Sequence, residues 1–214
     1  MNKLLVAVAL VASVSFTTVS ADDWFVRFGA VNVSPNSDSG AVLPDALGSN
    51  SLDVEADTQF GFNVTYMIDD TWGIEVLGAS IFKHDIRGEG SLDGADIGVT
   101  EHLPPTISAV YNFKSGDVRY HVGAGINYTK FFSDYPGADA QALGVSDLDL
   151  DASVGLSLKA GFDVPIADDW FFTANMYYIM IETEADIIAG NTTITTVDVD
   201  INPFVFMIGL GYSF

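Results

Sequence analysis

The sequence predicts an all-β protein, an eight-stranded antiparallel transmembrane β-barrel with short periplasmic turns and long extracellular loops. Three observations predict this fold. Large apolar residues alternate with small or polar ones along much of the chain, which is the pattern of strands with two unlike faces. The alternating segments are longer than most strands of soluble sheets. Short and long connections alternate between these segments, as in bacterial outer-membrane barrels.

The N-terminal residues 1–21 are expected to be a signal peptide that is cleaved after export. Lys3 precedes a largely apolar run, Leu4–Phe16, and the small residues Val19–Ala21 form a cleavage site. The apolar run is short for a membrane-spanning helix, which needs about 20 residues. The mature chain, residues 22–214, is therefore expected to form the barrel in the bacterial outer membrane.

Eight segments carry the alternation, and each is expected to form one strand. A strand of about ten residues, tilted by about 40°, rises about 25 Å, which is the height of the apolar band of such barrels. An even number of strands places both termini on the periplasmic side. In order, the expected strands are residues 24–33, 58–68, 72–82, 103–113, 119–132, 153–164, 170–182 and 200–214.

Parity divides each strand between two faces, because successive side chains point to opposite sides. In the last strand Phe206 and Ile208 share one face, and Met207 and Gly209 share the other. The large apolar set is expected to face lipid. This set includes Phe60, Phe62, Val64, Tyr66 and Ile68 in the second strand; Tyr120, Val122, Ala124, Ile126 and Tyr128 in the fifth; Val154, Leu156, Leu158, Ala160 and Phe162 in the sixth; and Trp170, Phe172, Ala174, Met176, Tyr178 and Met180 in the seventh.

A soluble lipocalin-like barrel is the chief alternative, and its apolar face would point inward. Two features favour the membrane barrel instead. Aromatic residues gather near the strand ends, as in the girdle at a membrane interface. Glycines on the opposite face suit a narrow lumen better than a solvated exterior. The aromatic residues are Trp24, Trp72, Tyr111, Phe113, Tyr120, Trp170, Tyr212 and Phe214, and the glycines are Gly61, Gly123, Gly125, Gly155, Gly161, Gly209 and Gly211.

The connections carry most of the acidic residues. The chain has 29 Asp and Glu against 8 Lys and Arg, and this balance argues against nucleic acid as a partner, because phosphates bind basic surfaces. Solvated outer loops are the simplest explanation for the acid. The short connections are residues 69–71, 114–118 and 165–169, and the long ones are residues 34–57, 83–102, 133–152 and 183–199.

Several short sequence motifs resemble those of a known protein family. His102-Leu-Pro-Pro-Thr and Gly123-Ala-Gly-Ile-Asn-Tyr-Thr are its most specific motifs, and Trp72–Ala79, Asp169-Trp170 and Pro203–Met207 add to it. In these stretches, which spread over nearly all of the mature chain, the sequence resembles the OmpW family of small outer-membrane barrels, including AlkL-like channels. The resemblance implies a monomer in contact with outer-membrane lipid and lipopolysaccharide, with a hydrophobic lumen that admits small apolar molecules.

The resemblance also implies roles for individual residues. In the family a leucine on the third strand and an aromatic residue on the seventh constrict the lumen, and the matching positions are Leu77 and Tyr177. Parity places both inward. The match at Tyr177 is partial, because a well-known member has tryptophan there. The C-terminal Phe214, with Tyr212, resembles the signal that the barrel-assembly machinery reads during insertion.

Charged residues and prolines within the expected strands need separate explanations. Parity places Arg27, Glu75 and Lys159 in the lumen, where an unpaired charge would be costly, so they are expected to form a paired polar cluster. Pro104 and Pro105 remove donors from the sheet. Either the fourth strand begins after them, or they weaken the wall and form a lateral exit for an apolar solute.

The sequence offers no catalytic or metal-binding residues and no cofactor motif. Its three histidines, His84, His102 and His121, do not combine with a nucleophile and an acid at recognisable spacing. Asp147–Asp151 lacks the glycine and glutamate of a calcium loop and is better explained as a strand that enters the barrel.

Three functions remain open. The leading hypothesis is a non-enzymatic, narrow channel for passive uptake of small hydrophobic molecules across the outer membrane. The alternative is a structural or receptor-like barrel whose acidic loops bind a phage, a toxin or host surfaces. The third is a lipid-modifying barrel enzyme.

Overall fold

The computed structural model describes residues 23–36, 38, 39, 50–132 and 134–214. The expected signal peptide, residues 1–21, lies outside the described residues. Within the described part of the chain, no helix is long and apolar enough to cross a membrane.

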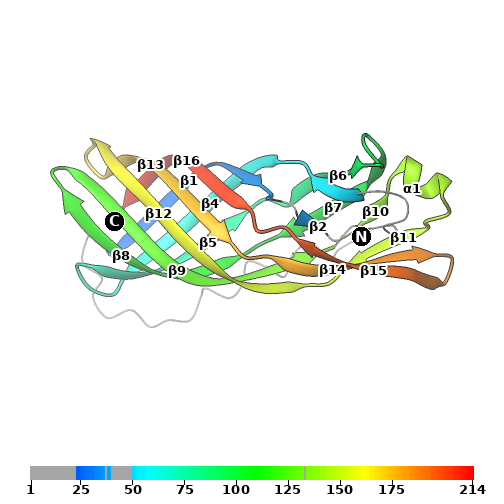
Figure 1. Ribbon diagram of the computed structural model, residues 1–214. Helices are drawn as coiled ribbons and strands as arrows, with labels where there is room; N and C mark the ends of the chain where they lie inside the picture. The colour runs from blue at the N-terminus through cyan, green and yellow to red at the C-terminus, as the bar shows by residue number, and fades with distance from the viewer. Residues whose placement is uncertain (1–22, 37, 40–49, 133) are drawn as a thin grey trace, which may run out of the picture.

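Eight strands pair antiparallel into a closed barrel (Figure 1). Their order around the barrel is β12, β13, β16, β1, β4, β5, β8 and β9, and pairing of β9 with β12 closes the ring. The predicted fold is confirmed. The barrel strands are β1 (Trp24–Ser34), β4 (Asp57–Met67), β5 (Trp72–Ala79), β8 (Thr106–Ser115), β9 (Val118–Phe131), β12 (Ser153–Ala167), β13 (Trp170–Ile179) and β16 (Phe204–Ser213).

The two ends of the barrel chain meet. β1 and β16 pair from Phe25 opposite Ser213 to Ser34 opposite Phe204, and Trp24 exchanges two backbone hydrogen bonds of 3.0 Å with Phe214. Ring closure matters because an unpaired backbone amide in hydrocarbon costs several kcal/mol. The C-terminal strand β16 therefore closes the wall by pairing with β1.

The inner and outer faces follow the parity of the sequence. Val154, on the outer face of β12, is 71 % exposed, whereas Lys159 of the same strand is buried inside. Glycines let two neighbouring strands of the wall lie close together: a Cβ on Gly209 would lie 2.0 Å from the carbonyl oxygen of Phe28. Only glycine lets the backbones of β16 and β1 approach so closely.

The aromatic residues at the periplasmic rim form neighbouring ring pairs. The ring centroids of Trp72 and Tyr111 lie 5.2 Å apart, and those of Trp170 and Tyr212 lie 5.1 Å apart. This arrangement is the girdle that anchors a barrel at one membrane interface. The C-terminus lies at this end, opposite α1 and the long hairpins (Figure 1).

The long extracellular connections are more ordered than the expected solvated loops. Among the described residues, each connection contains strands that continue the wall, because apolar side chains such as Leu148 and Leu150 alternate inward between outward carboxylates. The third and seventh expected strands are accordingly divided near Ser80 and Met180. The extension comprises β2 (Asp38–Ser39), β3 (Asn50–Val54), β6 (Phe82–Gly90), β7 (Asp96–Leu103), β10 (Tyr135–Pro136), α1 (Ala138–Ala142), β11 (Asp147–Leu150), β14 (Glu182–Ala189) and β15 (Thr192–Asp200).

Candidate functional site

An apolar cavity lies inside the extracellular extension. It encloses about 40 Å³ and is lined by side chains from several hairpins. Each lining strand supplies its inward set, since a strand with one apolar face turns that face away from water. The lining includes Leu52, Ile86, Leu148, Leu150, Val197 and Ile201, together with His84 and His102. The cavity can hold a small apolar group.

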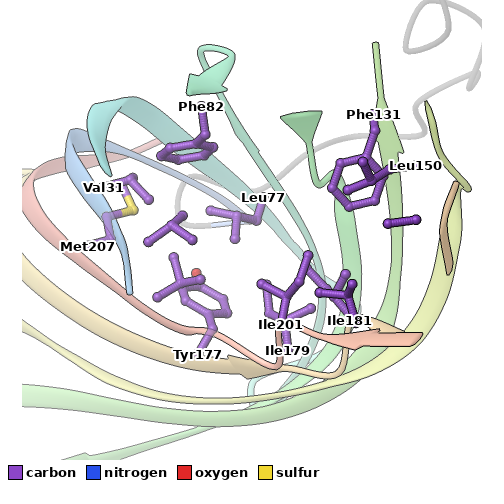
Figure 2. Packing of buried hydrophobic residues seen from close by; sticks show 14 of the residues in the cluster. Val31, Leu77, Phe82, Phe131, Leu150, Tyr177, Ile179, Ile181, Ile201 and Met207 are labelled. Atoms are coloured by element: carbon purple, nitrogen blue, oxygen red, sulfur yellow. The ribbon is translucent and has the colours of Figure 1, made fainter. Parts of the chain in front are cut away.

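Packed side chains form the floor of this cavity. Leu77 and Tyr177, the expected constriction, belong to one buried cluster with Val31, Ile179 and Met207. Figure 2 shows Leu77 and Tyr177 pointing into the barrel from different strands, with Met207 and Val31 beside them. Tyr177 is 0 % exposed and Leu77 is 5 % exposed. The lumen is therefore filled by side chains at this level.

Directly below, the carboxylate of Glu75 is the centre of a polar cluster. Lys159 Nζ lies 2.6 Å from both Glu75 oxygens, and the hydroxyl of Tyr177 donates to Oε1 at 3.0 Å. Thr65 donates to Oε2 at 3.0 Å. The phenol oxygen of Tyr177 also accepts a hydrogen bond from Asn63 Nδ2 at 3.0 Å. Tyr177 thus joins the apolar floor to the polar cluster.

A second carboxylate, Asp163, completes the cluster. Arg27 donates to its two oxygens from Nε at 3.0 Å and from Nη2 at 2.7 Å, and Arg27 Nη1 lies 3.6 Å from Glu75 Oε2. Two cations therefore face two carboxylates, and the charges balance, as a buried site requires. Arg27, Glu75 and Lys159 lie together in the lumen. The sequence analysis did not include Asp163 in the cluster, although it lies four positions after Lys159 in β12 and so shares its inward parity.

The three histidines lie in two places. His121 is buried in the lower lumen, where its Nε2 lies 3.5 Å from Asp163 Oδ1. His84 lies within β6 and His102 within β7, and their rings stack with centroids 4.8 Å apart. Within the part of the chain that the structure describes, no group of three or more His, Cys, Asp or Glu could hold a metal ion.

The histidine pair predicts a pH dependence of the β6–β7 hairpin. This hairpin lies outside the membrane, since its outward positions include Lys83 and Glu101. Burial lowers the pKa of His102 from 6.5 to about 3, and burial also lowers the pKa of His84. The opened hairpin therefore binds protons more readily than the closed one, so the closed form is most stable above pH 6.5 and loses stability as the pH falls toward 3.

At pH 5 the loss from His102 is expected to reach about 2 kcal/mol, and His84 adds to it in the same direction. Hydrogen exchange of the Phe82–Gly90 amides, corrected for intrinsic rates, should show faster opening at pH 5 than at pH 7.5. The variant His102→Phe keeps an aromatic ring and should show a smaller pH effect. Equal pH effects in the two proteins would contradict this explanation.

The wall of the barrel has a break at Pro104 and Pro105. β8 begins only at Thr106, so the sequence alternative in which the strand starts after the prolines matches the structure. Leu77 opposite Thr106 is the last pair of β5 with β8, and Phe82 opposite His102 is the first pair of β6 with β7. Between these pairs, residues 78–81 and 103–105 are not paired with each other in the described sheet. This break lies level with the apolar floor.

Aromatic rings and cations line the periplasmic mouth around a cavity of about 130 Å³ that reaches Asp163. The guanidinium carbon of Arg119 lies 3.8 Å from the ring centroid of Phe25, and Arg27 lies 5.5 Å from the ring centroid of Phe171. Such cation–π contacts stabilise the stacked groups. Tyr212 and Phe214 lie outside this mouth, on the outer rim of the barrel.

Comparisons with known proteins agree with this geometry. The model of the OmpW family matches residues 20–214. Outer membrane protein W of Vibrio cholerae serotype O1 is 41 % identical over 221 residues, which cover 100 % of both chains. Outer membrane protein W of Escherichia coli K12 is 36 % identical over 219 residues, again covering 100 % of both. The crystal structure of the outer membrane protein OprG from Pseudomonas aeruginosa superposes with a TM-score of 0.82 at 34 % identity, covering 91 % of this chain and 96 % of that one.

Proposed function

Because the chain belongs to the OmpW family of outer-membrane β-barrels, we propose that it is a narrow channel for passive uptake of small hydrophobic molecules. The observation that carries the proposal is the position of the wall break. It lies between an apolar cavity above and a charged cluster below. The driving force is burial of apolar surface, about 25 cal/mol per Å², and the protein needs no catalytic residue or cofactor for this task.

The route along the barrel axis is closed to an apolar solute. Below Leu77 the solute would have to displace the ion pairs of Glu75 with Lys159 and of Arg27 with Asp163. Breaking one partner from a buried pair costs about 3–5 kcal/mol. An apolar molecule has no charge or hydrogen-bonding group to replace these ion pairs, so it stops at the apolar floor.

The wall break provides the sideways route. Pro104 and Pro105 have no backbone N–H, and on the facing strand Gly78 has no side chain of its own and is covered only by the ring of Phe62. Outside the break, Pro105 borders a shallow apolar groove with Ile107, Ile126 and Tyr128. A solute that leaves the floor through the break therefore passes directly into the hydrocarbon of the membrane.

The double substitution Pro104→Val, Pro105→Thr tests this route. It restores two donors, so residues 103–105 can pair with residues 78–81, and uptake is expected to fall about threefold to fivefold, or about 1 kcal/mol of barrier. The measurement is uptake of a medium-chain hydrocarbon by vesicles with lipopolysaccharide in the outer leaflet. Pro165→Val, at the periplasmic end of β12, is the matched control. Unchanged uptake, with the new amides protected from hydrogen exchange, would exclude the lateral route.

The same proposal includes the surroundings of the barrel. The protein acts as a monomer among lipid and lipopolysaccharide, and the barrel-assembly machinery reads Phe214 and Tyr212 during insertion. The support is that Phe214 is 53 % exposed while its backbone closes the ring with Trp24. An accessible aromatic terminus on the final strand is suited to recognition before closure.

A further inference from the structure

Two buried imidazoles and the hydroxyl residue Thr100 interrupt the otherwise apolar lining of the extracellular cavity. His84 and His102 both line it and are 1 % and 2 % exposed. Their rings are nearly parallel, at 15°. The ring of Phe82 lies 6.2 Å from that of His84 and 5.7 Å from that of His102, and the ring of Phe131 lies 5.6 Å from that of His102. These aromatic neighbours hold the imidazoles in place without bonding their nitrogens.

The hydrogen bond of His84 determines which of its nitrogens carries the proton. Nδ1 lies 2.6 Å from the backbone carbonyl oxygen of Glu55. A carbonyl oxygen only accepts, so Nδ1 donates, and in a neutral ring Nε2 is then an acceptor. Burial lowers the pKa of His84 and keeps the ring neutral. The ring therefore presents one lone pair at a known atom.

That lone pair has no donor within the described chain. His84 Nε2 and His102 Nδ1 are both buried without a hydrogen-bond partner there. A buried polar atom left unsatisfied is destabilising, and such atoms in native proteins need an explanation. Thr100, which also lines the cavity, donates its hydroxyl to Asp134 Oδ1. A solute that carries its own donor would satisfy Nε2.

We propose that the cavity binds neutral amphiphiles that carry an O–H donor on an apolar body, such as medium-chain primary alcohols, and that His84 Nε2 accepts the hydroxyl hydrogen. The inference rests on the proposed function and names its solute class. The neutral imidazoles provide no charge for an anionic head group, and a plain alkane leaves Nε2 unsatisfied. The cavity of about 40 Å³ is smaller than the roughly 150 Å³ that holds benzene, so binding separates the hairpins.

The direct test is ¹⁵N NMR of the protein labelled at histidine in lipid nanodiscs. The chain has 3 histidines, so single substitutions assign every signal, and His121 in the lower lumen is an internal control. Titration with 1-octanol is expected to move the His84 Nε2 signal saturably toward that of a protonated nitrogen. Octane should leave it in place. A signal that ignores 1-octanol, or that responds equally to octane, overturns the inference.

Uptake by vesicles with lipopolysaccharide in the outer leaflet distinguishes this inference from the channel itself. His84→Phe keeps an aromatic ring in the stack but removes the acceptor, and is expected to lower 1-octanol uptake about fivefold, the value of one neutral hydrogen bond. Octane uptake should not change. Lys83→Gln, exposed on the same strand, is the matched control. Equal uptake of octane and 1-octanol by both variants and the wild-type protein would contradict only the proposed preference for alcohols. If neither solute enters through the wild-type protein, the proposed channel function is contradicted.

Discussion

Replacing Leu77 by tryptophan is expected to lower the uptake of apolar solutes by about tenfold or more, which corresponds to at least about 1.4 kcal/mol of added barrier. Leu77 is 5 % exposed and lies in the packed floor beside the wall break. An indole is larger than the leucine side chain and has to fill the space through which a solute turns sideways. The measurement is uptake of a medium-chain hydrocarbon by vesicles with lipopolysaccharide in the outer leaflet.

Val76→Trp is the matched control, because Val76 is the preceding residue of β5 and faces lipid, 42 % exposed. It introduces the same side chain on the opposite face and should leave uptake unchanged. Overpacking at Leu77 costs about 1–3 kcal/mol of stability, so folding of both variants has to be checked by their heat-dependent gel mobility. Wild-type uptake by a correctly folded Leu77→Trp protein would rule out a route past this residue.

Removing the central carboxylate of the polar cluster is expected to have the largest effect on stability. Glu75→Gln leaves Lys159, whose side chain is 0 % exposed, without its ion-pair partner. Breaking a buried pair in this way costs about 3–5 kcal/mol. The free energy of unfolding should fall by that amount in urea titrations of the protein in lipid vesicles, followed by tryptophan fluorescence.

A second substitution distinguishes the cost of the unpaired Lys159 charge from other effects of replacing Glu75. Glu75→Gln combined with Lys159→Met removes both charges, so most of the lost stability should return, and the double-mutant cycle measures the coupling. Asp198→Asn, at an exposed position of β15, should change stability by less than about 0.5 kcal/mol. Additive effects of Glu75→Gln and Lys159→Met would mean that the two side chains do not stabilise each other.

Alternation along single strands, together with the length of the strands and the order of short and long connections, was sufficient to predict the barrel. Successive side chains of a strand point to opposite faces, and lipid accepts only the apolar face. The inward direction of Arg27, Leu77 and Tyr177 therefore followed from their positions along their strands. The break at Pro104 and Pro105 could also be anticipated, because proline lacks a donor wherever it stands. The family resemblance pointed to the same inward residues.

The tertiary structure alone decided which residues meet. Arg27 and Asp163 are separated by 136 positions, and the stack of His84 on His102 depends on the register of β6 with β7. Parity assigns a side chain to a face, but the partner across the lumen depends on strand order, stagger and curvature of the closed sheet. The chain thus determined by itself which side chains point inward, whereas closure of the barrel decided which of them form the charged plug and which line the apolar cavity.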